Sequence, residues 1–240
     1  MTNDSTIRIG LVLPEVLGTY GDSGNATVLQ KRLEWRGIAA TVIPVRLDEP
    51  VPSGFDLYLL GGGEDAAQAL AAGHLRKHPG MQRAVASGAV VLGVCAGLQV
   101  LGTKFRGLDG VTHHGLGLLD VTTEPGDTRS VAELVAIPDA TLNEEPLTGF
   151  ENHLGQSTLG SSSTPLGRVI RGTGNGDGTE GAVTGKVVAT YLHGPVLARN
   201  PALADLLLSW LVGHPLSPLD LPEITQLRAE RLAVRGRARS

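Results

Sequence analysis

The most constraining feature of the sequence is an uninterrupted apolar run, Ala89 to Val94, that ends at Cys95. A strand with one face in water alternates polar and apolar side chains, whereas a strand inside a parallel sheet is covered on both faces. The run is far shorter than the roughly 20 residues that span a membrane. It therefore predicts a central strand of a parallel sheet with helices on both sides.

The rest of the chain repeats this alternation of short apolar strands and amphipathic helices. Strands are expected at 7–13, 38–45, 55–60, 118–122, 131–137 and 186–192, and helices at 26–37, 64–72, 75–87, 96–101 and 200–211. The polar stretch 155–185 is expected to form sheet edges and loops. The pattern predicts an α/β fold with a mostly parallel central sheet flanked by helices, and a ligand site at the carboxyl ends of the strands.

The 240 residues are expected to form one domain over 1–213, followed by a C-terminal segment over 214–240. Pro215, Pro218 and Pro222 indicate a linker. The charged residues that follow predict a final helix or tail, which either docks on a partner or is simply solvated.

Charge and composition exclude several classes of partner. Lys and Arg number 20 against 24 Asp and Glu, so no cationic excess is available to neutralise a nucleic acid backbone. The single cysteine cannot form an intrachain disulfide, and residues 1–5 do not resemble the start of a secretion signal. We expect a cytoplasmic protein with no nucleic acid partner and no transmembrane segment.

Cys95 follows the central strand in the sequence Gly93-Val94-Cys95-Ala96-Gly97, which is typical of a nucleophile elbow. Glycines two residues on either side let the strand and the next helix pack around a sharp turn. The N–H groups at the start of that helix, including that of Ala96, favour a thiolate and can bind an oxyanion. The pattern indicates a nucleophile, and the alternative is a small core cysteine.

A second glycine cluster, Gly61 to Gly63, ends another expected strand. Backbone N–H groups exposed at this edge would complete an oxyanion hole, with Gly62 as the expected donor. An ordinary strand-to-helix turn would carry the same glycines. Their expected place beside Cys95 favours the oxyanion interpretation.

His193 is the expected general base, because it ends the apolar strand at 186–192 on the edge of the sheet where Cys95 also lies. His153, in Gly149-Phe150-Glu151-Asn152-His153, is the competing candidate, and Asn152 is a further candidate site residue. No metal site is expected, since the histidines lack other ligands at metal-binding spacing. The glycine pattern at 176–181 lacks the strand and helix of a nucleotide site, so no cofactor is expected in this chain.

Together these segments are similar to a known family, the class I, triad-type glutamine amidotransferases of the CobB/CobQ-like subgroup. Within that subgroup they look most like the GatD group, the glutaminase subunits of lipid II isoglutaminyl synthase. The resemblance is carried by Tyr20-Gly21-Asp22-x-Gly24-Asn25, residues 29–37, Gly61-Gly62-Gly63, Cys95-Ala96-Gly97-x-Gln99, Gly149-Phe150-Glu151-Asn152-His153 and Tyr191-Leu192-His193-Gly194-Pro195.

The resemblance implies that Cys95 attacks the side-chain amide of L-glutamine while His193 transfers the proton, which yields glutamate and ammonia. It implies that Arg129 holds the glutamine carboxylate, for which a guanidinium fork is suited, and that Gln99 helps to position the substrate. The ammonia would pass, within a heterodimer, to a MurT-like Mur-ligase subunit that binds ATP and Mg. That partner would amidate the D-glutamate α-carboxylate of lipid II to D-isoglutamine in peptidoglycan synthesis.

One departure from the family pattern concerns the triad itself. Triad amidotransferases usually carry a Glu two residues after the histidine, and here Pro195 stands at that position. The orienting carboxylate is therefore expected to be missing from this chain and to come from the partner. The alternatives to the main interpretation are a glutaminase for cobyrinic or cobyric acid amidation, another cysteine hydrolase on the same fold, and a non-catalytic binding subunit.

Overall fold

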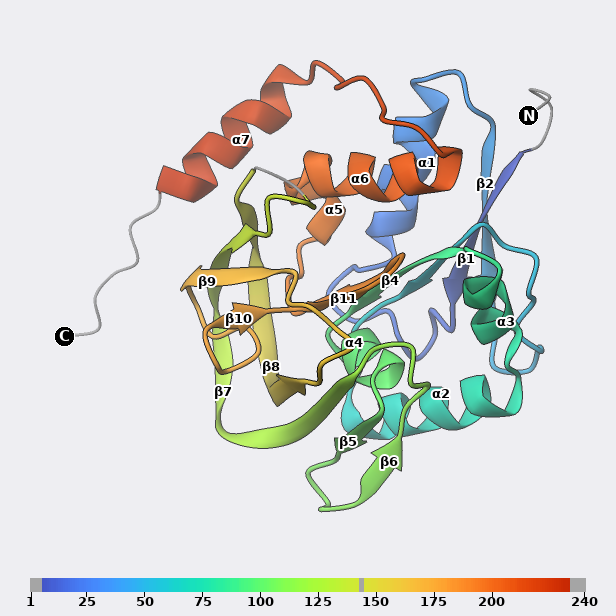
Figure 1. Cartoon of the computed structure of the whole chain (residues 1–240), viewed down its shortest axis with the longest axis vertical. Helices are drawn as coiled ribbons and strands as arrows, with labels where there is room; N and C mark the ends of the chain where they lie inside the picture. Colours follow the sequence, from blue (N-terminus) through green and yellow to red (C-terminus); the bar gives the residue numbers. More distant parts are fainter. Residues whose placement is uncertain (1–5, 143–144, 234–240) are drawn as a thin grey trace.

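The computed structural model describes residues 6–142 and 145–233, and its centre is a six-stranded sheet (Figure 1). The strand order is β11-β12-β4-β3-β1-β2, in which β11 is antiparallel to β12 and the other neighbours are parallel. The bounds are β1 (Ile7–Val12), β2 (Ala40–Val45), β3 (Leu57–Leu60), β4 (Val90–Val94), β11 (Ala182–Thr184) and β12 (Val187–Thr190). The predicted mostly parallel α/β sheet is thereby confirmed.

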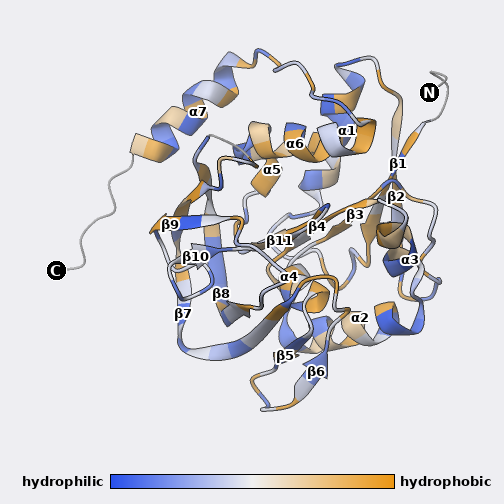
Figure 2. Cartoon of the chain, in the orientation of Figure 1, coloured by the Kyte–Doolittle hydropathy of each residue, from blue (hydrophilic) through white to orange (hydrophobic). Residues whose placement is uncertain are grey.

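Helices cover both faces of this sheet (Figure 1). On one face lie α1 (Gly24–Glu34), α5 (Val196–Arg199) and α6 (Pro201–Val212), and on the other α2 (Asp65–Lys77), α3 (Gly80–Ala86) and α4 (Ala96–Leu101). The central strand β4 is buried along its whole length, as its apolar run predicts, and Figure 2 shows its hydrophobic character. In the described ranges, no helix has the length and apolar character needed to cross a membrane.

One helix boundary differs from the sequence prediction. The sequence predicts a break at Gly73, but α2 runs through this residue and ends at Lys77. Gly73 is exposed, and a Cβ there would meet no atom within 4 Å, so the residue costs only the helix propensity of glycine, about 1 kcal/mol. The break falls instead at Pro79, which has no backbone N–H to donate.

A second sheet, which the sequence analysis does not foresee, occupies much of the chain between α4 and β11. Its order is β10-β9-β7-β5-β6, with β8 paired to β7. The expectation of only sheet edges and loops over 155–185 is wrong for β9, whose alternating buried and exposed residues are typical of a strand with one face in water. The bounds are β5 (Lys104–Arg106), β6 (Thr112–His114), β7 (Val121–Pro138), β8 (Leu147–Leu159), β9 (Gly167–Arg171) and β10 (Thr179–Glu180).

The two sheets share one hydrophobic core and meet at His193. Leu134 and Leu147 of the second sheet belong to the same buried cluster as the central strands. The His193 N–H donates to the Phe150 carbonyl at 2.8 Å, and the Phe150 N–H donates to the His193 carbonyl at 3.0 Å. These bonds fix β8 against the carboxyl end of β12, at the edge where the ligand site is expected.

The C-terminal segment, for which the sequence predicts a helix or a tail, contains a helix, α7 (Pro222–Ala233). Residues 234–240 lie outside the described residues. Arg228 attaches this helix to the domain: its guanidinium donates to the carbonyl oxygens of Pro146, at 2.9 Å, and Arg199. No residue of α7 is buried. The helix therefore rests on the surface of the domain, and the domain boundary at residue 213 stays a prediction.

Candidate active site

Cys95 lies at the turn from β4 into α4, where the sequence predicts a nucleophile elbow. Its backbone has φ 53° and ψ −104°, a conformation that residues with a Cβ rarely adopt. The Cys95 N–H donates to the Thr190 carbonyl at the end of β12, at 2.8 Å. The neighbouring strand thus holds the strained turn that presents the thiol at the edge of the sheet.

The glycines of the elbow are required by close packing. A Cβ on Gly93 would lie 2.9 Å from the backbone carbonyl carbon of Gly97, and a Cβ on Gly97 would lie 2.8 Å from the carbonyl oxygen of Leu60. Backbone atoms cannot yield as a flexible side chain does. The steric reason for the glycine frame, which the sequence predicts, is therefore confirmed.

In this conformation the Cys95 thiol is neutral at physiological pH. Burial, reinforced by the negative charge of Asp22, raises the pKa of Cys95 to about 12. The Ala96 N–H at the start of α4 bonds the sulfur and acts in the opposite direction, but its influence is smaller. The helix start favours the thiolate, as expected, but the expectation of a lowered pKa for Cys95 is wrong, because desolvation outweighs this effect. The thiol consequently needs a base.

His193 is oriented by a carboxylate of this chain. Its Nδ1 lies 3.0 Å from Oδ2 and 3.1 Å from Oδ1 of Asp22, and both side chains are buried. Its Nε2 is buried and has no hydrogen-bond partner within residues 6–142 and 145–233. The expectation that the chain lacks an orienting carboxylate, drawn from Pro195, is therefore wrong: the loop after β1 supplies it, rather than the residue two positions after the histidine.

Gly62 contacts Asp22, His193 and Cys95. A Cβ at residue 62 would lie 2.9 Å from Cε1 of His193, 3.2 Å from Oδ2 of Asp22 and 3.6 Å from Cβ of Cys95. Its N–H donates to Oδ2 of Asp22 at 2.8 Å. This bond contradicts the prediction of a free oxyanion donor at Gly62, because the N–H already holds the carboxylate. Ala96 stays the predicted donor beside the sulfur.

A pocket opens over Cys95 at the carboxyl ends of the central strands. The loop after β1, α4 and the two long strands β7 and β8 form its walls. Tyr20 stands at this pocket with its ring edge-on to His193, the ring centroids 4.9 Å apart. The lining includes Tyr20, Cys95, Gln99, Arg129, Asn152 and His153. The structure thus brings all the predicted side chains except His193 to the pocket lining, and His193 lies directly behind Tyr20 and Gly62.

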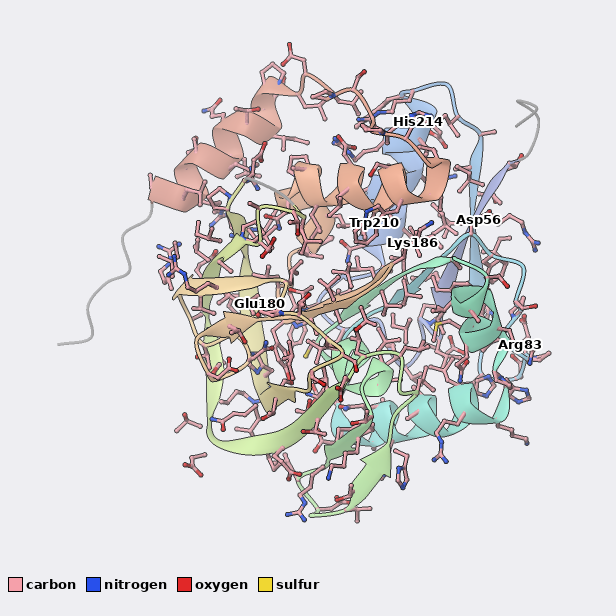
Figure 3. The ribbon with its side chains drawn as sticks, in the orientation of Figure 1. Asp56, Arg83, Glu180, Lys186, Trp210 and His214 are labelled. Atoms are coloured by element: carbon pink, nitrogen blue, oxygen red, sulfur yellow. The ribbon has the colours of Figure 1, made fainter. Side chains whose placement is uncertain are left out.

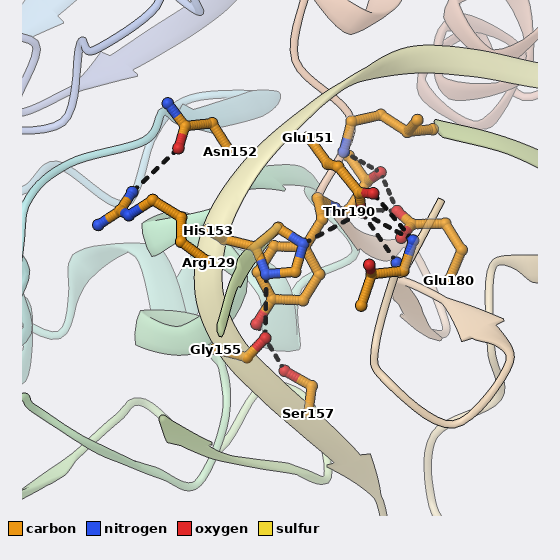
Figure 4. A network of polar contacts seen from close by, with 12 residues as sticks. Arg129, Glu151, Asn152, His153, Gly155, Ser157, Glu180 and Thr190 are labelled. Carbon is orange, nitrogen blue, oxygen red and sulfur yellow. Dashed lines mark hydrogen bonds and ion pairs between the residues drawn. The ribbon is translucent and has the colours of Figure 1, made fainter. Parts of the chain in front are cut away.

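Arg129 reaches the pocket from a bulge in β7. Pairing between β7 and β8 is interrupted between Pro125 and Ser130, where residues 126–129 of β7 face the single residue Leu154 of β8. Nη1 of Arg129 donates to Oδ1 of Asn152 at 3.0 Å (Figure 4). Nδ2 of Asn152 in turn donates to the Tyr20 hydroxyl at 2.6 Å. A guanidinium held in this way presents a fork suited to a carboxylate.

Gln99 lies on α4, one turn after Cys95, and its amide is oriented by neighbouring side chains. Oε1 accepts a bond from Nε2 of Gln68 at 2.5 Å, and Nε2 donates to the Tyr191 hydroxyl at 3.4 Å. The Tyr191 hydroxyl also bonds Oγ of Ser157 at 2.8 Å. This polar network supports the side of the pocket next to the thiol, and the role of Gln99 in positioning a substrate stays a prediction.

His153 is not placed to act as the base for Cys95. Its Nδ1 bonds the Gly155 carbonyl at 3.0 Å, and its Nε2 faces Glu151 at 3.3 Å (Figure 4). Both ring nitrogens are thus occupied by other groups.

No candidate metal site is found in residues 6–142 and 145–233. In these ranges no group of three or more His, Cys, Asp and Glu side chains is arranged to hold a metal ion.

Comparison with protein families gives an assignment that agrees with this geometry. Residues 8–201 match the model of the CobB/CobQ-like glutamine amidotransferase domain. The chain belongs to the CobB/CobQ-like glutamine amidotransferase family. The matched range contains Asp22, Cys95, Arg129 and His193 and ends at the start of α6, so α7 lies outside the family match.

Within this amidotransferase family, two curated relatives resemble most of the chain. The GatD subunit of lipid II isoglutaminyl synthase (glutamine-hydrolyzing) from Staphylococcus aureus (strain N315) is 33% identical over 229 residues, which cover 92% of each chain. The corresponding subunit of Streptococcus pneumoniae (strain ATCC BAA-255 / R6) is 32% identical over 203 residues, 82% of this chain and 77% of that protein. The cobyric acid synthase of Sphingopyxis alaskensis is 36% identical over 129 residues, but these cover 51% of this chain and 24% of that enzyme.

Solved structures show the same amidotransferase fold. A crystal structure described as a glutamine amidotransferase superposes with a TM-score of 0.59 at 22% identity, covering 85% of this chain and 98% of that one. The glutaminase domain of Trypanosoma brucei CTPS, solved with bound acivicin, superposes with a TM-score of 0.52 at 11% identity, covering 88% and 96% of the two chains. At these identities the likeness concerns the fold alone.

The amidotransferase site contains two residues to which the sequence analysis gives no role, Asp22 and Tyr20. Both lie in the Tyr20-Gly21-Asp22 motif, which follows β1. Loops after parallel strands gather at one edge of the sheet. An acidic residue in such a loop was therefore a candidate partner for His193. The sequence shows that Asp22 follows a strand, but it does not show how far Asp22 lies from His193.

Proposed function

We propose that this chain is the glutaminase subunit of a lipid II isoglutaminyl synthase, hydrolysing L-glutamine to glutamate and ammonia. The observation that carries the proposal is the thiol of Cys95 on a strained elbow beside a buried His193–Asp22 pair. The proposal is supported by the 33% identity to a GatD subunit over 92% of the chain.

The His193–Asp22 pair provides the proton transfer that a neutral thiol requires. Asp22 accepts the Nδ1 proton of His193, which leaves Nε2 bare to act as a base. Nε2 has no hydrogen-bond partner among the described residues, and it bonds the thiol in the substrate complex, because catalytic hydrogen bonds commonly tighten only there.

The reaction proceeds through a covalent thioester. As Sγ of Cys95 attacks the side-chain amide carbon of glutamine, the thiol proton passes to Nε2 of His193. The Ala96 N–H bonds the developing oxyanion. The imidazolium then protonates the amide nitrogen, which leaves as ammonia. Water, deprotonated by His193, hydrolyses the glutamyl thioester to glutamate, and the proton returns to the thiolate.

Substrate recognition falls to Arg129, with Gln99 beside the thiol. The Arg129 guanidinium binds the glutamine α-carboxylate and exchanges its bond to Asn152 for bonds to the substrate. Because the same Asn152 bonds Tyr20, this exchange also loosens Tyr20 at the pocket.

The ammonia is consumed by a MurT-like Mur-ligase partner in a cytoplasmic heterodimer. That partner binds ATP and Mg, activates the D-glutamate α-carboxylate of the lipid II stem peptide, and forms D-isoglutamine with the ammonia. The lipid II substrate and the nucleotide therefore belong to the partner, and L-glutamine is the substrate of this chain.

The test is release of glutamate and ammonia from L-glutamine by the wild type and by Cys95→Ser, each alone and with a MurT-like subunit, ATP and lipid II. We expect release that requires Cys95 and is coupled to amidated lipid II. Parallel reactions with a cobyrinic acid acceptor and its synthetase test the second candidate. Absence of release under every condition would support a non-catalytic binding subunit instead.

A further inference from the structure

Beside the pocket, Glu151 and His153 form a buried pair that the proposed reaction does not use. Glu151 is 0% exposed and His153 is 3% exposed. Residues two apart on a strand point to the same face, which brings these side chains together on β8. Oε2 of Glu151 lies 3.3 Å from Nε2 of His153. Such a pair is costly to bury and calls for an explanation.

The hydrogen bonds of this pair determine where its protons lie. The Gly155 carbonyl can only accept, so Nδ1 of His153, at 3.0 Å, carries a proton. The Glu151 carboxylate accepts the backbone N–H groups of Thr173, at 2.9 Å, and Gly174, at 3.0 Å. His153 therefore lies between two fixed groups, with Nδ1 donating to the Gly155 carbonyl and Nε2 facing the Glu151 carboxylate at 3.3 Å.

An aromatic ring packs directly on the His153 side chain. The Tyr191 ring, which follows β12, stacks on the imidazole with centroids 3.8 Å apart. Glu180, on β10 (Figure 3), accepts bonds from the Thr190 hydroxyl and the Tyr191 N–H (Figure 4). The backbone of the stacking residue is thus held by Glu180.

The partner of Nδ1 lies opposite the bulge that carries Arg129. Ladder pairing of β8 stops at Gly155 and resumes at His153, and only Leu154 separates them. A Cβ on Gly155 would lie 2.6 Å from Nε2 of Gln99 and 2.9 Å from the Tyr191 hydroxyl, so this backbone packs directly on the side of the pocket next to the thiol. Where the regular ladder is interrupted, the His153 side chain bonds the Gly155 carbonyl.

We propose that His153 is a positioning residue: its Nδ1–H holds the Gly155 carbonyl, fixes the β8 side of the bulge, and so keeps Asn152 and the Arg129 guanidinium in place at the pocket, where Arg129 binds the carboxylate of glutamine. The proposal rests on the proposed glutaminase function. Asn152 is the neighbour of His153, and its amide oxygen holds the Arg129 guanidinium at 3.0 Å. Substitution of His153 is therefore expected to weaken glutamine binding rather than to slow the chemical step.

Two isosteric substitutions separate the bonds of His153. The amide nitrogen of Asn takes the place of Nδ1, so His153→Asn keeps the bond to Gly155, whereas the amide nitrogen of Gln takes the place of Nε2, so His153→Gln keeps only the bond to Glu151. We expect His153→Gln and His153→Ala to raise KM for glutamine about tenfold or more, and His153→Asn to stay near the wild type, with kcat changed little in all three. Thermal melts show whether each variant is folded.

Binding is measured separately by calorimetric titration of L-glutamine in the Cys95→Ser background, with and without the His153 substitutions. If Cys95→Ser with His153 intact binds no glutamine, the proposed function itself fails. If it binds and His153→Gln binds equally well, only the positioning role is overturned. Weaker binding by folded His153→Gln, restored in His153→Asn, supports it.

A spectroscopic measurement needs neither activity nor a variant that folds. Nitrogen-15 imidazole spectra of the full-length wild type, assigned by the loss of one ring signal in His153→Asn, report the protonation of each ring nitrogen. A protonated Nδ1 is expected for His153, as its bond to the Gly155 carbonyl requires. A bare Nδ1 would overturn the proposal.

Discussion

The carboxylate of Asp22 lies 3.0 Å from Nδ1 of His193, although 171 positions separate the two residues in the sequence. The same carboxylate accepts the Gly62 N–H at 2.8 Å, so one side chain connects the loop after β1, the end of β3 and the end of β12. The histidine is thereby oriented in a chain that has Pro195 where related triads carry a glutamate.

Asp22→Asn is expected to reduce the glutaminase kcat on the order of 10²-fold to 10⁴-fold with little change in KM, because the imidazolium loses its counter-charge and its tautomer is no longer fixed. Steady-state glutamate release in the complex measures the effect. The matched control is Asp139→Asn, since Asp139 is exposed and bonds Thr141 in a turn away from the pocket. An unchanged kcat for Asp22→Asn would return the orienting role to the partner.

The pKa of Cys95, raised to about 12 mainly by burial, predicts the pH dependence of its reactivity. Alkylation by iodoacetamide requires the thiolate, whose fraction rises about tenfold per pH unit below the pKa. We expect the rate of alkylation to rise throughout pH 7 to 10 without a plateau. Intact-mass spectrometry measures this rate directly, because the chain has 1 cysteine.

The same reagent separates thiol reactivity from catalysis. The negative charge of Asp22 raises the pKa of Cys95, so Asp22→Asn should alkylate faster than the wild type at a fixed pH while hydrolysing glutamine more slowly. A plateau below pH 9 in the wild type, or slower alkylation of Asp22→Asn, would contradict this account of the thiol.

Glu180 is expected to make the protein less stable as the pH rises. Burial raises its pKa from 4.5 to about 7, so between these values the native chain keeps a proton that the unfolded chain has lost. Stability then falls as the pH rises through this window, in total by about 3 kcal/mol for a shift of this size. Glu180→Gln should remove that dependence in urea titrations from pH 4.5 to 7.5, whereas exposed Glu223→Gln should leave it unchanged.

The elbow glycines allow a direct test of packing. A Cβ on Gly97 would lie 2.8 Å from the Leu60 carbonyl oxygen, so Gly97→Ala is expected to cost about 1–3 kcal/mol of unfolding free energy. Gly73→Ala is the matched control, because an exposed helical glycine with free space gains up to about 1 kcal/mol on the same change. Opposite shifts in thermal midpoint are expected, and equal shifts would refute the steric argument.

The parts of the fold that the sequence predicted are those governed by local pattern. The uninterrupted apolar run before Cys95 predicted the central strand, because burial on two faces requires apolar residues. The glycines around Cys95 predicted the elbow, because close backbone packing there excludes a Cβ. The alternation over β9 was a weaker signal, because a strand with one solvent-exposed face resembles a polar loop in sequence. The strand β9 was missed for that reason.

Side-chain partners across long sequence separations could not be predicted from the sequence. The sequence placed His193 at the carboxyl edge of the sheet but gave Asp22 no role, because it shows no distance between the two residues. Gly62 was predicted to donate to an oxyanion because the position of its competitor, the Asp22 carboxylate, was unknown. The pKa of Cys95 was predicted in the wrong direction because pattern shows the helix start but not the depth of burial.

Tyr20 and Asp22 lie two residues apart on one loop. Tyr20 bonds Asn152 at the pocket, and Asp22 bonds the base, His193. A ligand that wedges Tyr20 away from Asn152 would also pull on the segment that keeps His193 in place. Inhibition at this loop would then displace the base without modifying the thiol. A substitution at Tyr20 that prevents binding of such a ligand would also lower kcat.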